Sequence, residues 1–227
     1  MDTAQTGNAS LDDEQILDPV EARVLGCLVE KQATTPDVYP LTLNATVAAC
    51  NQKTNREPIL DLEPGEVGNA LRRLEARGIV VGSLSARSTR YEHRMDAVYG
   101  ITPRQRAVLA ALLLRGPQTM SEIATRSARL AQFPDPDDVR DALDRLMHRE
   151  PALMVRLPHG PGQREDRYMH LLAGPIAVTE FSELPQRSLR SHDDSNLAAR
   201  VANLESQIET LQAELAAVAA RLPAPND

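Results

Sequence analysis

The sequence predicts a mainly α protein with small β-hairpins, in the α+β class, built from two tandem copies of one unit and a C-terminal coiled-coil helix. Three observations predict it. A helix-start motif occurs twice, each occurrence is followed by further helices and a β-rich hairpin, and a heptad pattern closes the chain. The length of 227 residues suits two small domains and a tail.

The first helix of each unit begins with the same motif. Residues 18–21 (Asp-Pro-Val-Glu) and 102–105 (Thr-Pro-Arg-Gln) each place a capping side chain before a proline, with a carboxylate or amide three positions after the cap. Such a pair satisfies free N–H groups at the helix start, and proline loses no hydrogen bond there. The apolar residues that follow match at an offset of 84: Val24, Leu25, Leu28 and Val29 with Val108, Leu109, Leu112 and Leu113.

The later elements of the two units also match. A short second helix begins at Thr42 and ends near Cys50, and its counterpart begins at Thr119, with Glu122 completing a capping box. Third helices follow at an offset of 72, with Val67, Leu71 and Leu74 matching Val139, Leu143 and Leu146. A hairpin closes each unit, one with strands near 79–81 and 90–93, the other with strands near 153–155 and 168–172.

Three helices and a hairpin in this order predict the winged-helix topology. The predicted organisation is a disordered acidic N-terminus at 1–16, winged-helix domains at 17–98 and 99–173, a linker at 174–195 and a coiled-coil helix at 196–222. The fall in offset from 84 to 72 indicates an insertion of 12 residues in the first domain, around 51–62, which Pro58 makes non-helical. This insertion is either a functional loop or a tolerated surface loop.

The distribution of charged residues makes the first predicted domain a better candidate for DNA binding than the second. Residues 22–174 carry 21 Lys and Arg against 18 Asp and Glu, whereas the acidic surplus lies in the tails. The predicted DNA-contacting residues lie in the insertion, third helix and wing of the first domain: Asn51, Lys53, Asn55, Arg56, Arg72, Arg73, Arg87, Arg90 and Arg94. The alternative is that these arginines form a solvated, salt-bridged surface. The third helix of the second domain is rich in aspartate, and we expect it not to read DNA.

The C-terminal heptad pattern predicts a parallel two-stranded coiled coil, and hence a homodimer. Its two apolar columns are Leu197, Val201, Leu204, Ile208, Leu211, Leu215, Val218 and Leu222. The alternative is a helix that folds back onto its own domains.

No catalytic pattern is present in the sequence, so we expect a protein that is not an enzyme and that uses no cofactor or metal. The five histidines lack metal-ligand spacing, and Cys27 and Cys50 are expected to be buried structural thiols. The longest apolar run, 107–114, is far too short to span a membrane, and the polar N-terminus lacks the apolar core of a signal peptide. We therefore expect a cytoplasmic protein without membrane association.

Four segments resemble the YceH-like bacterial proteins of unknown function: residues 17–26, 39–44, 51–58 (NQKTNREP) and 99–105. The resemblance covers roughly residues 15–173 and implies a tandem winged-helix fold in a bacterial cytoplasmic protein, with no established substrate. The resulting expectation is a DNA-binding protein of the transcription-regulator type. The alternative is a winged-helix scaffold that binds a protein partner and not DNA.

Overall fold

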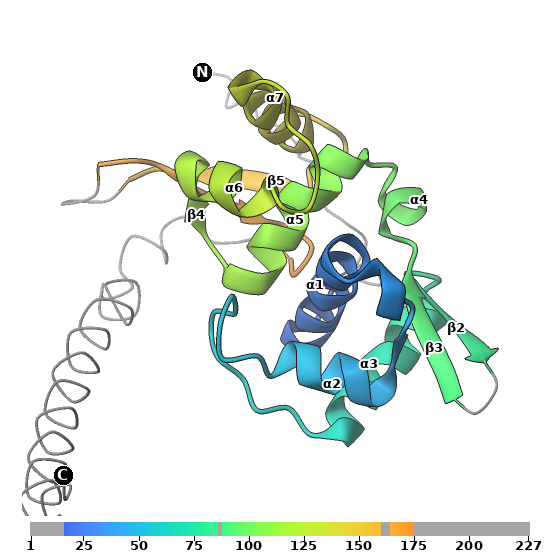
Figure 1. Ribbon diagram of the computed structural model, residues 1–227. Coiled ribbons are helices and arrows are strands. Elements are labelled where there is room, and N and C mark those ends of the chain that lie inside the picture. Colours follow the sequence, from blue (N-terminus) through green and yellow to red (C-terminus); the bar gives the residue numbers. More distant parts are fainter. Residues whose placement is uncertain (1–15, 86–87, 160–163, 175–227) are drawn as a thin grey trace, which may run out of the picture. The chain divides into compact units, whose positions relative to one another are not determined.

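The computed structural model describes residues 16–85, 88–159 and 164–174 (Figure 1). The N-terminal half contains α1 (Pro19–Thr34), the 3-10 helix η2 (Pro36–Val38), β1 (Leu41–Thr42), α2 (Leu43–Cys50), α3 (Pro64–Ala76), β2 (Val80–Ser85) and β3 (Ser88–His93). A short helix, α4 (Met95–Tyr99), leads into the second half. The C-terminal half contains α5 (Pro103–Arg115), β4 (Gln118–Thr119), α6 (Met120–Ser127), α7 (Pro136–Met147), β5 (Met154–Leu157) and β6 (Arg167–His170). The described chain is thus of mixed α+β class, and the order helix, strand, helix, helix, hairpin occurs twice.

The predicted capping motifs are confirmed at the start of both long first helices. In α1, Asp18 Oδ1 accepts hydrogen bonds of 2.8 Å from the N–H groups of Val20 and Glu21, and Glu21 Oε2 accepts one of 2.9 Å from the Asp18 N–H. In α5, the Gln105 N–H donates to Thr102 Oγ1, and the Thr102 N–H donates to Gln105 Oε1. Each helix therefore begins with its free N–H groups satisfied by its own sequence.

Each half contains a three-stranded antiparallel sheet, whereas the sequence predicted only a hairpin. The strand orders are β1-β3-β2 and β4-β6-β5. The additional strands pair Leu41 with Tyr91 and Gln118 with Tyr168. Because β1 and β4 are two residues long, they are too short to show alternation in the sequence. Each ends at the threonine that caps the following helix, as at Thr42.

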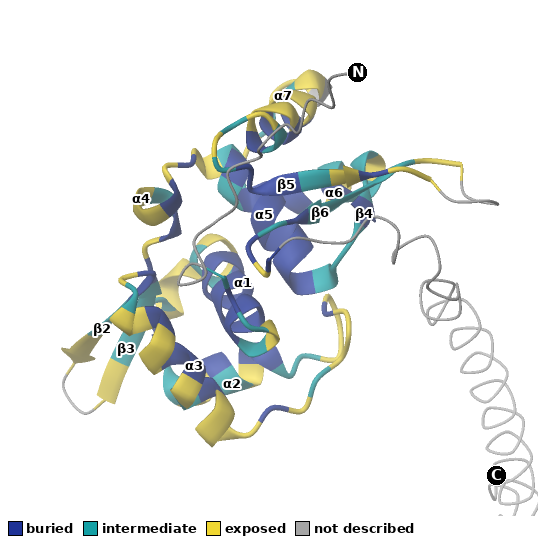
Figure 2. Cartoon of the chain, turned by 180° about the vertical axis from the view of Figure 1, so that it is seen from behind, coloured by how far each residue is buried: buried dark blue, intermediate teal, exposed yellow. Residues whose placement is uncertain are grey.

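Two buried helices, α1 and α5, lie at the centre of the described residues (Figure 2). Side chains from both halves form one hydrophobic core. The helices approach closely at Gly26, where an added Cβ would lie 3.0 Å from Leu114 Cγ. A side chain at this position would therefore push α1 and α5 apart.

The two hairpins differ in length. The β2–β3 ladder runs from the Val80–His93 pair to the Ser85–Ser88 pair, while β5 and β6 are four residues each. Near the end of the longer hairpin, the Leu84 side chain is 85% exposed. We keep the label wing, taken from the predicted topology, for the β2–β3 hairpin.

Several predictions concern parts of the chain that lie outside the described residues. These are the N-terminal segment 1–15, the linker from 175 onward, and the predicted coiled coil with all eight of its heptad positions. Within the part of the chain that is described, no helix combines the length and apolar character needed to cross a membrane.

Candidate nucleic-acid interface and an arginine cluster

The predicted insertion, residues 51–62, contains neither helix nor strand, and hydrogen bonds hold it at both ends. The Asn51 Nδ2 group donates to the Leu62 carbonyl, and the Leu62 N–H donates to Asn51 Oδ1, both at 2.9 Å. In the middle, the Glu57 N–H donates to the Leu114 carbonyl at the end of α5, at 2.9 Å. The Asn51 amide therefore closes the loop, and it is not available to bond a base edge.

Arg56 lies inside the fold rather than on its surface. Its side chain is 0% exposed, and NH2 contacts Glu30 Oε2 at 2.5 Å, while Nε donates to the Ala49 carbonyl at 3.0 Å. Burial, the largest single influence, would lower the pKa of Arg56, but the hydrogen bond to Glu30 together with the nearby charge of Glu30 and the two cysteines raises the pKa overall. A buried cation needs such a partner. Arg56 is therefore a structural residue of the loop, and it is removed from the predicted DNA-contacting set.

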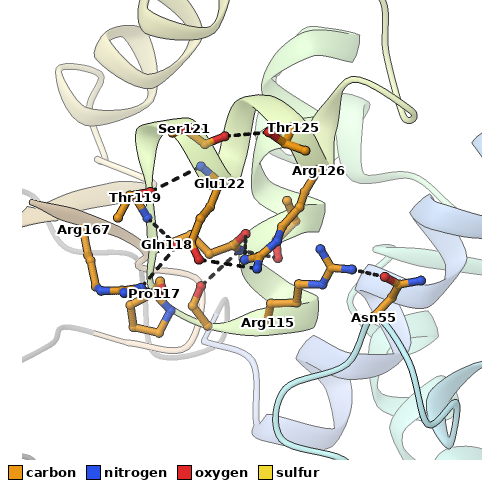
Figure 3. Close-up of polar contacts among 12 residues, drawn as sticks. Asn55, Arg115, Pro117, Gln118, Thr119, Ser121, Glu122, Thr125, Arg126 and Arg167 are labelled. Carbon is orange, nitrogen blue, oxygen red and sulfur yellow. Dashed lines mark hydrogen bonds and ion pairs between the residues drawn. The ribbon is translucent and has the colours of Figure 1, made fainter. Parts of the chain in front are cut away.

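Asn55 has a left-handed backbone conformation, with φ of 62°, which Asn adopts more readily than most residues. This turn directs its carbonyl to Arg56 NH1, at 2.8 Å, and its side-chain oxygen to Arg115 NH2 in the second half (Figure 3). Lys53, two residues earlier, is exposed. Asn51, Asn55 and Arg56 all use their side chains in hydrogen bonds within the fold. Lys53 is thus the loop residue of the predicted interface whose side chain is exposed to solvent.

The arginines of α3 divide into two kinds. Arg73 pairs with Asp18 and, at 2.8 Å, with Glu21, so it links α3 to the start of α1. Arg77 also pairs with Glu21, at 2.6 Å. Arg72 is exposed and donates to the neutral Asn69 side chain of the same helix. Arg73 is consequently engaged in internal ion pairs, and Arg72 is the α3 arginine that faces solvent with no carboxylate partner among the described residues.

The two described arginines of this hairpin region, Arg90 and Arg94, also have partners within the fold. Arg90 is half-buried, and its NH1 group donates to the Pro40 carbonyl at 2.8 Å. Arg94 is 53% exposed at its side chain and pairs with Glu92 at 3.0 Å. Arg87 lies outside the described residues. Of the nine predicted residues, Lys53 and Arg72 are thus the described cations that are exposed and have no carboxylate partner among the described residues, whereas Arg73 and Arg94 are exposed but ion-paired.

A second concentration of positive charge was missed by sequence reasoning. It comprises Arg56, Arg115, Arg126 and Arg129, which we call the arginine cluster. Arg115 ends α5, Arg126 lies in α6 and Arg129 follows α6. Glu30 joins two of its members, because Oε2 contacts Arg56 and Oε1 contacts Arg129 NH2 at 2.6 Å.

Arg115 and Arg126 have mainly neutral partners (Figure 3). Arg126 NH1 donates to Gln118 Oε1 at 2.6 Å, and its NH2 lies 3.4 Å from Glu122 Oε1. Arg115 donates to the Asn55 amide oxygen, and among the described residues no carboxylate lies within ion-pair distance of it. Burial, together with the charges of Arg126 and Arg129, lowers the pKa of Arg115 to about 10. Positive charge therefore exceeds negative charge around Arg115.

The third helix of the second half has the opposite character. On α7, Asp141 and Asp144 are exposed, and Asp137 pairs with Arg140 at 3.3 Å. Asp138 pairs with Arg104 of α5 at 2.6 Å. The exposed carboxylates of α7 would repel a phosphate backbone.

The two cysteines are buried free thiols, as predicted. Cys50 ends α2, and its carbonyl accepts a hydrogen bond of 3.2 Å from Arg23 NH1, whose NH2 group also donates to the Pro58 carbonyl at 2.7 Å. Arg23 therefore satisfies the C-terminus of α2 and holds the loop. Within the described ranges, no group of three or more His, Cys, Asp or Glu side chains could hold a metal ion.

Comparison with known proteins gives a family but no activity. The family described as "Protein of unknown function, DUF480" matches residues 17–163. A UPF0502 protein of Mesorhizobium japonicum is 50% identical over 207 residues, which cover 91% of this chain and 98% of the relative. A UPF0502 protein of Xanthomonas campestris pv. campestris is 51% identical over 213 residues, covering 92% and 95%. One from Stenotrophomonas maltophilia is 50% identical over 214 residues, covering 93% and 98%. In agreement with the YceH-like segments, the chain belongs to the DUF480, or UPF0502, family of bacterial proteins of unknown function.

Proposed function

We propose that this chain is a tandem winged-helix protein that binds double-stranded DNA through α3 and the wing of its first half. The repeated order of helix, strand, helix, helix and hairpin, with strand order β1-β3-β2, supports the winged-helix assignment. In helix-turn-helix proteins the recognition helix enters the major groove. By this analogy α3 is the recognition helix, and the wing reaches the flanking backbone.

The observation that carries the proposal is the exposed face of α3. Asn69 and Arg72 are exposed on it, and Gly65 and Gly68 precede them at helical spacing. A Cβ added at Gly65 would meet no atom within 4 Å, and one at Gly68 would meet only Leu43, at 3.9 Å. Internal packing therefore does not require these glycines, although glycine costs a helix up to about 1 kcal/mol relative to alanine. These glycines would allow the major groove of DNA to approach α3 closely, with Asn69 and Arg72 placed to hydrogen-bond adenine and guanine.

The small positive charge on this surface predicts that DNA binding is weak and that its affinity depends only modestly on salt concentration. Lys53 and Arg72 are exposed without a carboxylate partner among the described residues, and Arg73 and Arg94 are exposed but ion-paired. Glu63 and Glu66 at the start of α3 oppose this positive charge. If about three phosphates are contacted, the logarithm of the association constant should fall with the logarithm of salt concentration with a slope of roughly −3. A much steeper slope would indicate another, more cationic surface.

The test is fluorescence anisotropy of a labelled random-sequence duplex at two salt concentrations. The Asn69→Ala/Arg72→Ala double variant should bind about tenfold more weakly or worse. Arg140→Ala, which removes an exposed arginine from α7, is the matched control and should leave affinity unchanged. The proposal fails if the full chain does not bind at low salt, or if the double variant binds like the unmodified chain.

Two observations favour the alternative, a protein-binding scaffold. Leu84, near the end of the wing, is 85% exposed, and the α7 surface is acidic. An exposed aliphatic side chain contributes free energy when a partner removes it from water. Under this alternative, Leu84→Ser abolishes capture of a stoichiometric protein partner and leaves DNA binding absent. Loss of DNA binding on Leu84→Ser, with no protein recovered, would instead favour the first proposal.

A further inference from the structure

We propose that the arginine cluster binds a phosphate group, with Arg115 and Arg126 as its principal ligands and Arg129 beside them. The site lies where α6 and the end of α5 meet the loop 51–62. It is separate from the α3 surface, so it does not depend on the proposed DNA contact there.

The charges in the cluster do not balance. Four guanidinium groups face two carboxylates, Glu30 and Glu122, and Glu122 also pairs with Arg167 at 3.3 Å. The two Glu30 oxygens are engaged by Arg56 and Arg129. A surplus of at least two positive charges remains, which is the charge that a phosphate dianion would neutralise. Guanidinium groups bond phosphate through paired N–H donors, so the residue type also fits.

The donors are accessible and only partly solvated. The side chain of Arg126 is 32% exposed and that of Arg129 is 42% exposed, while Arg115 is half-buried. Partial burial strengthens an electrostatic contact relative to one in open water. Arg115 and Arg126 donate their shortest bonds to the neutral side chains of Asn55 and Gln118. Exchanging a neutral acceptor for a phosphate oxygen would gain charge-assisted hydrogen bonds.

The arginine cluster is electrostatically unfavourable on its own. The lowered pKa of Arg115, caused first by burial and then by neighbouring arginines, means that its positive charge is disfavoured in the folded state. A bound anion would relieve this effect. Because Asn55 belongs to the loop and Arg115 to the second half, an anion there would also connect the two segments.

The test uses the full chain and inorganic phosphate, by isothermal titration calorimetry and thermal unfolding, with sodium chloride of equal ionic strength as the comparison. Phosphate should bind saturably and raise the unfolding temperature with concentration, whereas chloride should not. Arg115→Gln and Arg126→Gln should each weaken phosphate binding about tenfold or more. Arg115→Lys keeps the charge but not the forked donors, and should give an intermediate affinity.

Arg140→Gln is the control, since it removes a comparable exposed arginine outside the cluster. Absence of saturable phosphate binding would overturn the proposal, as would an equal loss in Arg140→Gln and Arg115→Gln. Folding is checked separately, because Arg115→Gln should unfold at no lower a temperature than the unmodified chain without phosphate.

Two sources of the phosphate group are distinguishable with the same variants. If Arg115→Gln lowers duplex affinity and free phosphate competes with the duplex, a DNA backbone supplies the group. If Arg115→Gln loses phosphate binding while duplex affinity is unchanged or absent, the ligand is a small phosphorylated molecule. Either outcome supports the site, and the α3 variants report separately on the proposed DNA surface.

Discussion

Glu30 in α1 forms an ion pair with Arg129, 99 residues further along the chain, with 2.6 Å between Oε1 and NH2. The Glu30 side chain is 4% exposed, and its other oxygen binds the buried Arg56. One carboxylate thus connects α1, the loop 51–62 and the segment after α6. Removing its charge would leave Arg56 buried without an anionic partner.

Glu30→Gln should therefore destabilise the fold by about 3 kcal/mol, because an unpaired buried charge is costly. The measurement is the free energy of unfolding in urea. Asp137→Asn, which removes an exposed ion pair with Arg140, is the control and should change stability by less than about 1 kcal/mol. Equal effects of the two substitutions would show that burial of Glu30 is not decisive.

Gly26→Val should destabilise the protein by about 2 kcal/mol or more, since the added side chain meets Leu114 where α1 and α5 touch. Gly68→Ala provides the contrast. Its Cβ would meet Leu43 only at ordinary contact distance, so the higher helix propensity of alanine should raise stability by about 0.5–1 kcal/mol. Urea unfolding of both variants gives the comparison, and a neutral Gly26→Val would contradict the close packing.

Stability should fall with acidification because of two buried histidines at matching positions. His93 ends β3 and His170 ends β6. Burial lowers the pKa of each to about 4, from an ordinary value of 6.5, and in His93 the charge of Arg106 contributes. The Met95 N–H donates to His93 Nδ1, so the neutral ring carries its proton on Nε2, which donates to Gln32.

In the unfolded chain these two histidines become protonated as the pH falls below 6.5, whereas in the folded chain they stay neutral down to about pH 4. The stabilising contribution is therefore complete above pH 6.5 and is lost as the pH falls toward 4, by about 2 kcal/mol per histidine at pH 5. Unfolding free energies at pH 7.5 and 5 measure this loss. His93→Gln should reduce the difference between the two values, whereas His148→Gln, at an exposed position, should not.

The heptad pattern of residues 197–222, outside the described part of the chain, predicts a dimer. Light scattering coupled to gel filtration should give twice the chain mass, and Leu204→Asp/Ile208→Asp should give a monomer. A dimer that survives this double substitution would place the association elsewhere.

Local signals in the sequence explain why much of the fold was predictable. The caps at Asp18 and Thr102 and the buried faces of α1 and α5 depend on residues a few positions apart. The strands β1 and β4 were missed because two residues carry no periodicity. The short α4 was also missed, and its cap, Arg94, makes no side-chain capping bond.

The candidate site was less predictable, since the partner of a charged side chain is set by the folded chain. Arg73 pairs with Glu21, 52 positions away, and Arg56 with Glu30, 26 positions away. Counting charges in the first domain therefore overestimated its free cations. The arginine cluster was not predicted because its members, from the loop, the end of α5 and α6, are brought together only by the folded chain.

The absence of a side chain at Gly26 bears on whether the two halves of the chain can be separated. Gly26 allows α1 to pack directly on α5, so side chains from each half form part of the hydrophobic core of the other half. Cutting the chain at the α4 connection would expose apolar surface on both fragments. We therefore expect that neither half folds stably when it is expressed without the other.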